Sequence, residues 1–486
     1  MRLIAILTCS IFFSLPALVN GYPLVFPDSG TYVRQAIALS GELNRHPYYS
    51  LFIFPIHMRV SLWPIVFAQG VIASIFFYIT IRVMGYKRPL LFLVYLTAIL
   101  TLFTSLPWFS SEIMPDVFTG LVILSVFLLA FAWERLSLGE RWLLVFGLAV
   151  MLTFHPTFPP LTILLSGFVM AVHLLRRVPR RQVLRTQALL LGPVSLAFLA
   201  MIVYSEALIH QATILPWTPP VMLARVIADG PGRAYLRESC KSGTPYLFCA
   251  YLDKLPDNVN DFDNVNDFLF ASDSPLLKVT QSAGVERTRA EASSIVRHAI
   301  LRYPLWQLKQ SLINFAHQLI MFRGIEPTLC QRNGTDEQLK SCLNKFLITK
   351  VVAQYFASEF NDYINSRQSN DKLSLMIIYY IDVTVVLLSG AICLSLAYSW
   401  RKSGGPPESL LSDLLAVIVM GVASNAALTG ILSAPQDRYQ ARVIWLLPFF
   451  IVLYFGRPAA SSAWTDRWTA LARIPTSAFS GSGDDA

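Results

Sequence analysis

The sequence predicts an all-α, polytopic transmembrane helical bundle, and two observations lead to that prediction. Hydrophobic residues make up 54% of the 486 residues, whereas charged residues make up only 14%, a balance typical of membrane proteins. About ten apolar segments run along the chain, and most approach the roughly 17–25 residues that a spanning helix needs. We expect spans at 3–22, 62–84, 89–106, 117–133, 142–154, 159–175, 187–209, 374–398, 411–432 and 442–456.

Positive charge in the loops predicts the orientation of the bundle. The net charge of +9 lies mostly in alternate loops, where Lys and Arg mark the cytoplasmic side of a membrane. The loop after the sixth span shows this best, because it carries Arg176, Arg177, Arg180, Arg181 and Arg185. Both termini are then cytoplasmic, in what we expect to be a bacterial inner (plasma) membrane. The charge is explained by topology, so we expect membrane lipids and no nucleic acid as partners.

The first apolar segment has two interpretations. Arg2, an apolar run and small residues near Ala17 are also features of a cleaved signal peptide. No clear small-x-small site precedes the polar loop, so we expect a retained helix. Cleavage would leave every later loop on the same side.

The segments divide the chain into four parts. Residues 1–212 form a seven-span transmembrane module, and 213–372 form a mostly helical extracytoplasmic segment. Residues 373–456 add three spans, and 457–486 form a cytoplasmic tail whose composition predicts disorder.

One stretch of the extracytoplasmic segment, 289–322, has apolar residues at helical spacing. Pro304 interrupts the stretch and divides it into two predicted helices. Helices of this kind commonly lie along a membrane surface.

The extracytoplasmic segment also contains four of the six cysteines, which are Cys240, Cys249, Cys330 and Cys342. An even number in one large extracytoplasmic region predicts two disulfides. We expect local pairing, Cys240 with Cys249 and Cys330 with Cys342, although four cysteines allow three connectivities. A zinc site is the alternative, but the spacings match no zinc motif.

An acidic residue, Asp28, follows the first span directly. A carboxylate at the extracytoplasmic end of an apolar helix can be partly desolvated and can act as a general base. The alternative is structural, because Asp28 or Ser29 could cap a helix over 30–42. One residue can have both roles.

The same loop carries Arg45 and His46, followed by an aromatic and apolar run. A cationic pair in this position suits a phosphate whose lipid tail enters the bilayer, since a guanidinium binds phosphate oxygens bidentately. The alternative is an interfacial belt, in which Tyr and Arg anchor the chain at headgroup level.

Two carboxylates, Glu112 and Asp116, lie four residues apart before the fourth span. At this spacing we expect them on one helical face. Pro115 is typical of a helix start and places Asp116 in the first turn, so a structural role explains Asp116 better than it explains Glu112.

Two basic candidates complete the set. His155 lies in a tight turn between the fifth and sixth spans. The alternative is that it is simply a polar residue of the turn with no functional role. Arg438 precedes the last span on a side otherwise poor in positive charge, which favours a binding role. All seven candidates lie at the mouths of apolar helices on one face, and ionisable groups in such places are functional candidates.

This pattern resembles the GT-C-type glycosyltransferases, polytopic enzymes that use polyprenyl-phosphate sugars, among them protein O-mannosyltransferases and lipid A aminoarabinose transferases. The matching stretches are PDSGTY, RHPYYSLF, SSEIMPD, AILRYPLWQLKQSLINF and the late DRY. The resemblance covers the seven-span first half best and implies a GT-C-like architecture.

The resemblance also implies roles for the candidate residues. Asp28 would match a first-loop carboxylate that activates the acceptor hydroxyl or helps to bind a divalent metal. Arg45, His46 and Arg438, with His155, would bind the lipid-linked phosphate, and Glu112 and Asp116 would lie beside a second acidic position. Many relatives have two adjacent acids in the first loop, whereas Ser29 follows Asp28 in this sequence. We therefore expect a metal-free mechanism, with a divalent metal as the alternative.

The expected function is glycosyl transfer from a polyprenyl-phosphate-linked donor to a hydroxyl of a lipid, glycan or protein acceptor. The alternatives are a transporter or flippase, an oligosaccharide polymerase or ligase, and a structural assembly protein. A transporter would concentrate ionisable residues at mid-bilayer. Few such residues besides Asp382 are found there, which favours an enzyme.

Overall fold

The computed structural model describes residues 1–243, 246–255, 262–271, 273–323, 329–330, 335–373, 375–403 and 409–457. Within these ranges the regular structure is helical, and strand-like pairing is limited to one parallel bridge between Leu24 and Glu112. The predicted all-α class is therefore confirmed for the described part of the chain. The predicted tail, apart from Arg457, lies outside the described residues.

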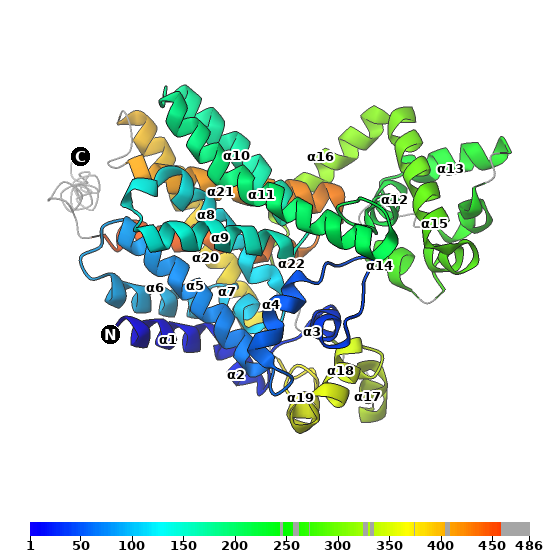
Figure 1. Cartoon of the computed structure of the whole chain (residues 1–486), viewed down its shortest axis with the longest axis horizontal. Coiled ribbons are helices and arrows are strands. Elements are labelled where there is room, and N and C mark those ends of the chain that lie inside the picture. The colour runs from blue at the N-terminus through cyan, green and yellow to red at the C-terminus, as the bar shows by residue number, and fades with distance from the viewer. Residues whose placement is uncertain are drawn as a thin grey trace, which may run out of the picture.

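Each predicted apolar segment coincides with a helix or with a pair of helices (Figure 1). In the first module these are α1 (Arg2–Phe13), α2 (Leu15–Asn20), α5 (Trp63–Val83), α6 (Pro89–Phe103), α8 (Phe118–Phe131), α9 (Leu138–Phe154), α10 (Phe158–Leu175) and α11 (Arg180–Ile209). Near the C-terminus they are α20 (Met376–Lys402), α21 (Ser409–Leu432), α22 (Asp437–Ile444) and α23 (Leu446–Phe455).

Five of the described helices, α5, α10, α11, α20 and α21, are long and apolar enough to cross a membrane. They indicate a polytopic membrane protein. The helices α1 and α6 and the stretch Pro115–Phe131 are apolar but shorter, at 10–17 residues. The count of ten spans therefore stays a prediction.

Prolines explain why the first and last predicted spans are each divided in two. Pro16 has no N–H to donate to the carbonyl of Phe12, and the helix breaks at Ser14, between α1 and α2. In the same way Pro448 cannot donate to Ile444, where α22 ends.

Residues of the long central segment form further helices of 6 to 28 residues (Figure 1). Their bounds are α12 (Thr218–Ala228), α13 (Pro231–Lys241), α14 (Phe262–Phe270), α15 (Pro275–Arg302), α16 (Pro304–Ile320), α17 (Asp336–Leu343), α18 (Leu347–Tyr355) and α19 (Phe360–Asn365). The predicted division at Pro304 is confirmed. Disulfides join Cys240 to Cys249 and Cys330 to Cys342, as the local pairing predicts.

Helix α16 buries its polar face and exposes its apolar one. Gln310, Asn314 and Gln318 are buried, while Leu308 and Leu312 are 55% and 58% exposed. The buried side makes specific hydrogen bonds, among them two between Gln318 and the backbone of residue 436. An exposed apolar face is favourable in contact with lipid, so this helix fits a membrane-facing position.

The basic loops meet at one end of the bundle, which we call the basic end. There Arg82 pairs with Glu140, Arg185 with Glu134, and Arg176 with Asp413.

The opposite end, which we call the site end, contains α3 (Ser29–Ala38), α4 (Tyr48–His57) and α7 (Leu106–Ser111). Helix α5 joins the two ends, and its 21 residues give a length of about 30 Å, close to the hydrophobic thickness of a membrane.

Candidate functional site

Two carboxylates and two guanidinium groups form a buried cluster at the site end. Arg438 donates from Nη2 to Glu112 Oε2 at 3.0 Å and to Asp116 Oδ2 at 2.6 Å. Arg442 Nη1 donates to the other Asp116 oxygen at 2.9 Å. The four side chains are between 0% and 9% exposed. The cluster is therefore largely sealed from bulk water, and each carboxylate is neutralised by direct contact.

Pro115 explains how the chain presents the two carboxylates. Glu112 follows α7 in an extended conformation, and Met114, directly before the proline, is also extended, as expected for that position. Pro115 then begins a 3₁₀ turn that continues as α8 and contains Asp116. The predicted helix start is confirmed. The prediction that Glu112 and Asp116 share a helical face is wrong, because the chain between them is not helical.

The two arginines come from successive turns of α22. Their spacing of four residues places them on one helix face, so both reach Asp116. Arg442 also donates to Asn425 Oδ1 of α21 at 3.0 Å, and the Arg438 guanidinium lies 3.6 Å from the centre of the Phe26 ring. Sequence reasoning missed Arg442 because it falls within the predicted span 442–456. A second arginine four residues after Arg438, at the start of a predicted span, is the sequence feature that could have identified it.

Asp28 and Arg45 form a second, more accessible ion pair. Arg45 Nη2 lies 2.5 Å from Asp28 Oδ2, and the Arg45 and Asp28 side chains are 17% and 31% exposed, respectively. Arg45 is positioned by Tyr32 of α3, to whose hydroxyl it donates at 3.2 Å. Asp28 occupies the N-cap position of α3 but makes no side-chain cap hydrogen bond. Helix capping therefore does not occupy its carboxylate.

His155 lies next to the buried cluster. Its Nδ1 accepts the backbone N–H of Thr157 at 3.3 Å and is 2.7 Å from the Thr157 hydroxyl. That hydroxyl oxygen also accepts a hydrogen bond from Arg442 Nη2 at 3.4 Å. These contacts place the ring hydrogen on Nε2 and connect the turn after α9 to the arginines of α22.

His46 has different surroundings, although it is the neighbour of Arg45 in the sequence. The side chain is buried, and its Nε2 donates to the carbonyl of Ile214 at 2.7 Å. Its ring packs against Tyr48 and Tyr204. The structure thus gives His46 a packing role outside the cluster. The other six predicted residues lie in two layers: a buried layer, which is the cluster with His155, and an accessible layer, which is the pair Asp28–Arg45.

Burial and neighbouring charges shift the pKa values of the site residues in different directions. Burial raises the pKa of Glu112 to about 7, although Arg438 opposes the shift. Asp116 is also buried, but Arg438 and Arg442 together hold its pKa well below the usual range. Burial, with the charge of Arg442, lowers the pKa of His155 to about 3. Near neutral pH Asp116 is therefore an anion, His155 is neutral, and Glu112 is close to its titration point.

The donor groups do not fit a divalent metal. Among the described residues there is no group of three or more His, Cys, Asp or Glu side chains placed to hold one. Arg438 binds both Glu112 and Asp116, and Arg45 binds Asp28, so guanidinium groups already take the positions that a metal ion would need.

Comparison of the chain with protein-family models, with curated proteins and with solved structures found no significant match. The geometry and chemistry of the site therefore carry the functional argument.

Proposed function

We propose that the chain is an integral-membrane glycosyltransferase that moves a sugar from a polyprenyl-phosphate donor to an acceptor hydroxyl at the extracytoplasmic face. The observation that carries the proposal is the accessible pair Asp28–Arg45, which lies near a buried cluster of carboxylates and arginines. A base and a phosphate-binding cation are the two groups that this transfer needs most. Both lie at helix ends, where a lipid-linked donor and a polar acceptor can meet.

Arg45 is the residue best placed to bind the donor phosphate. It is partly exposed, and Tyr32 holds its guanidinium through the hydroxyl and through a ring centre 5.2 Å away. An arriving phosphate would compete with Asp28 for the guanidinium, because both present oxygens suited to it. Donor binding would then release the Asp28 carboxylate from its partner.

Asp28, once released, would act as the general base. The acceptor oxygen attacks the anomeric carbon, and its proton passes to the Asp28 carboxylate. The bond between that carbon and the phosphate oxygen breaks, and the polyprenyl phosphate leaves with the electron pair beside Arg45. General-base assistance of this kind typically contributes about 10²–10⁴-fold to a rate.

Glu112, Asp116, Arg438 and Arg442 would position this machinery without touching the reacting atoms. Arg438 is only 4% exposed and binds both carboxylates, so its guanidinium is not free for a phosphate. Its contact with Phe26, two residues before Asp28, connects the buried cluster to the accessible pair.

The test is sugar transfer from a panel of radiolabelled polyprenyl-phosphate sugars in membranes that contain the wild type or Asp28→Asn. The matched control is Glu42→Gln, because Glu42 is a partly exposed carboxylate paired with Arg34 in the same loop. We expect transfer to fall at least about 100-fold in Asp28→Asn and to stay within about twofold in the control.

Equal transfer by both variants and the wild type would remove Asp28 from the mechanism. Absence of transfer from every donor, together with uptake of substrate into proteoliposomes, would instead favour a transporter. Asp382, an acidic residue within a predicted span, gives little support to that alternative. Its Oδ1 is buried and accepts a hydrogen bond from the Ser105 backbone N–H at 2.9 Å, so a structural contact already occupies it.

A further inference from the structure

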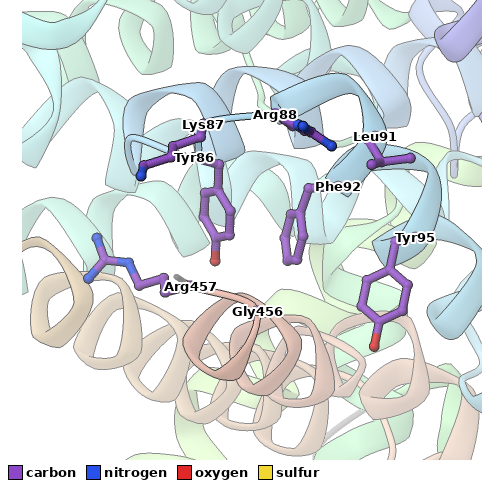
Figure 2. Close-up of a pocket in the computed structure, with 8 residues that line it drawn as sticks. All are labelled: Tyr86, Lys87, Arg88, Leu91, Phe92, Tyr95, Gly456 and Arg457. Carbon is purple, nitrogen blue, oxygen red and sulfur yellow. The ribbon is translucent and has the colours of Figure 1, made fainter. Parts of the chain in front are cut away.

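An open cavity of about 600 Å³ lies at the basic end, between the α5–α6 connection and the end of α23. Figure 2 shows Lys87 above Arg457 at the left of the view, with the rings of Tyr86 and Phe92 side by side to their right. Arg88 lies beside Leu91. Helix α5 separates this cavity from the site end by about 30 Å, so the cavity is distinct from the transfer site.

The cavity combines positive charge with an apolar wall. Lys87, Arg88 and Arg457 line it, and no acidic side chain does so within the described part of the chain. Lys87 and Arg88 are exposed, and neither has an ion-pair partner among the described residues. Below them on α6, Leu91 is 63% and Tyr95 is 56% exposed.

The back wall of the cavity is rigid. The Tyr86 and Phe92 rings stack with centres 4.2 Å apart, and the Tyr86 hydroxyl donates to the Leu453 carbonyl near the end of α23. Phe92 also packs so closely on Gly456 that a side chain at this glycine would overlap the ring. A rigid wall keeps the cavity open without a ligand. This favours binding, because few side chains lose conformational entropy when a ligand enters.

We propose that this cavity binds an anionic phospholipid of the leaflet at the basic end, with its phosphate between Lys87, Arg88 and Arg457. One acyl chain lies along the exposed surface of Leu91 and Tyr95. The charge pattern selects the ligand, because three cations without a lining carboxylate favour an anionic headgroup over a zwitterionic one. The apolar surface beside the cations favours a membrane lipid over a free phosphate compound. The proposal is independent of the transfer reaction.

The test is native mass spectrometry of the full chain, released from detergent, with added phosphatidylglycerol, phosphatidylcholine or glycerol 3-phosphate. The test variant is Lys87→Gln/Arg88→Gln. The matched control is Arg180→Gln/Arg181→Gln, which removes two exposed cations at the start of α11, outside the cavity. All four residues are exposed, so both variants are expected to fold.

We expect the test variant to bind phosphatidylglycerol about 25-fold more weakly, from about fivefold for each lost charge. The control should bind it as the wild type does, and glycerol 3-phosphate should not displace it. Unchanged binding by the test variant would overturn the proposal, and so would an equal loss in the control. Displacement by glycerol 3-phosphate would also overturn it, because the ligand would then be a soluble phosphate compound.

Discussion

The two layers of the candidate site use the same chemical groups in different surroundings. The pair Asp28–Arg45 is 31% and 17% exposed, whereas Asp116 and Arg442 are 4% and 0% exposed. In the buried layer Asp116 is held by Arg438 and Arg442, whereas Glu112 is held by Arg438 alone. Removing either arginine therefore leaves a buried carboxylate without a partner that it has in the wild type, which carries a large penalty. In the accessible layer water can replace a lost contact, so the pair can exchange partners. Under the proposed function, the buried layer would position the site and the accessible layer would carry out the transfer.

Removal of Arg442 should have the largest effect on stability. The Arg442→Ala variant leaves the buried Asp116 with one of its two cations, and we expect a loss of about 3–5 kcal/mol in the free energy of unfolding. Arg45→Ala, the matched change in the accessible layer, should cost less, because water can replace part of the lost contact with Asp28. Thermal unfolding of both purified variants measures the difference. Equal losses would show that the two layers do not differ energetically.

The pH dependence of stability sharpens the comparison. Burial raises the pKa of Glu112 from an ordinary 4.5 to about 7 in the folded protein. Between about pH 4.5 and 7 the folded state therefore binds more protons at this group than the unfolded state. Its contribution makes stability fall as pH rises through this window and level off above it.

We expect the melting temperature of the wild type to fall by several degrees between about pH 5 and 7.5 through this group. Glu112→Gln removes the titration, so its melting temperature should change less over the same range. Asp28→Asn, in the accessible layer, serves as the control and should keep the wild-type slope. A Glu112→Gln curve parallel to that of the wild type would contradict the assignment.

His46 should give the smallest effect on sugar transfer, because it lies outside both layers. His46→Phe keeps the ring packing against Tyr48 and Tyr204 and loses the hydrogen bond to Ile214. We expect a cost of about 1 kcal/mol in stability and sugar transfer within about twofold of the wild type. A large loss of transfer in a folded variant would return His46 to the phosphate-binding residues.

Apolar runs and prolines made much of the fold predictable. The helix pair divided at Pro304 and the helix start at Pro115 follow from the missing N–H and the fixed φ of proline, which can be recognised in the sequence itself. The extended conformation of Glu112 was not predicted, because spacing in the sequence says nothing about a break in the helix between two residues. Helical spacing therefore identified two residues that do lie together in the site, Glu112 and Asp116, but it predicted the wrong backbone conformation between them.

The composition of the site was predictable only where charge was unusual for its place. Asp28 and Arg438 stand out beside apolar spans, but the partner of each depends on contacts across long stretches of sequence. Arg442 was missed because it falls within a predicted span, and His46 was included although its ring contacts Ile214, Tyr48 and Tyr204 instead of the cluster. The difference in exposure between the two layers is a tertiary property and could not be read from the chain.

The most direct test of the two-layer account measures sugar transfer and melting temperature on the same preparations of Asp28→Asn and Asp116→Asn. The account predicts that Asp28→Asn loses transfer and keeps the wild-type melting temperature, because its carboxylate reacts and is partly solvated. Asp116→Asn should lower the melting temperature strongly, because two buried arginines lose their shared anion. A stable Asp116→Asn variant together with a fully active Asp28→Asn variant would contradict the account.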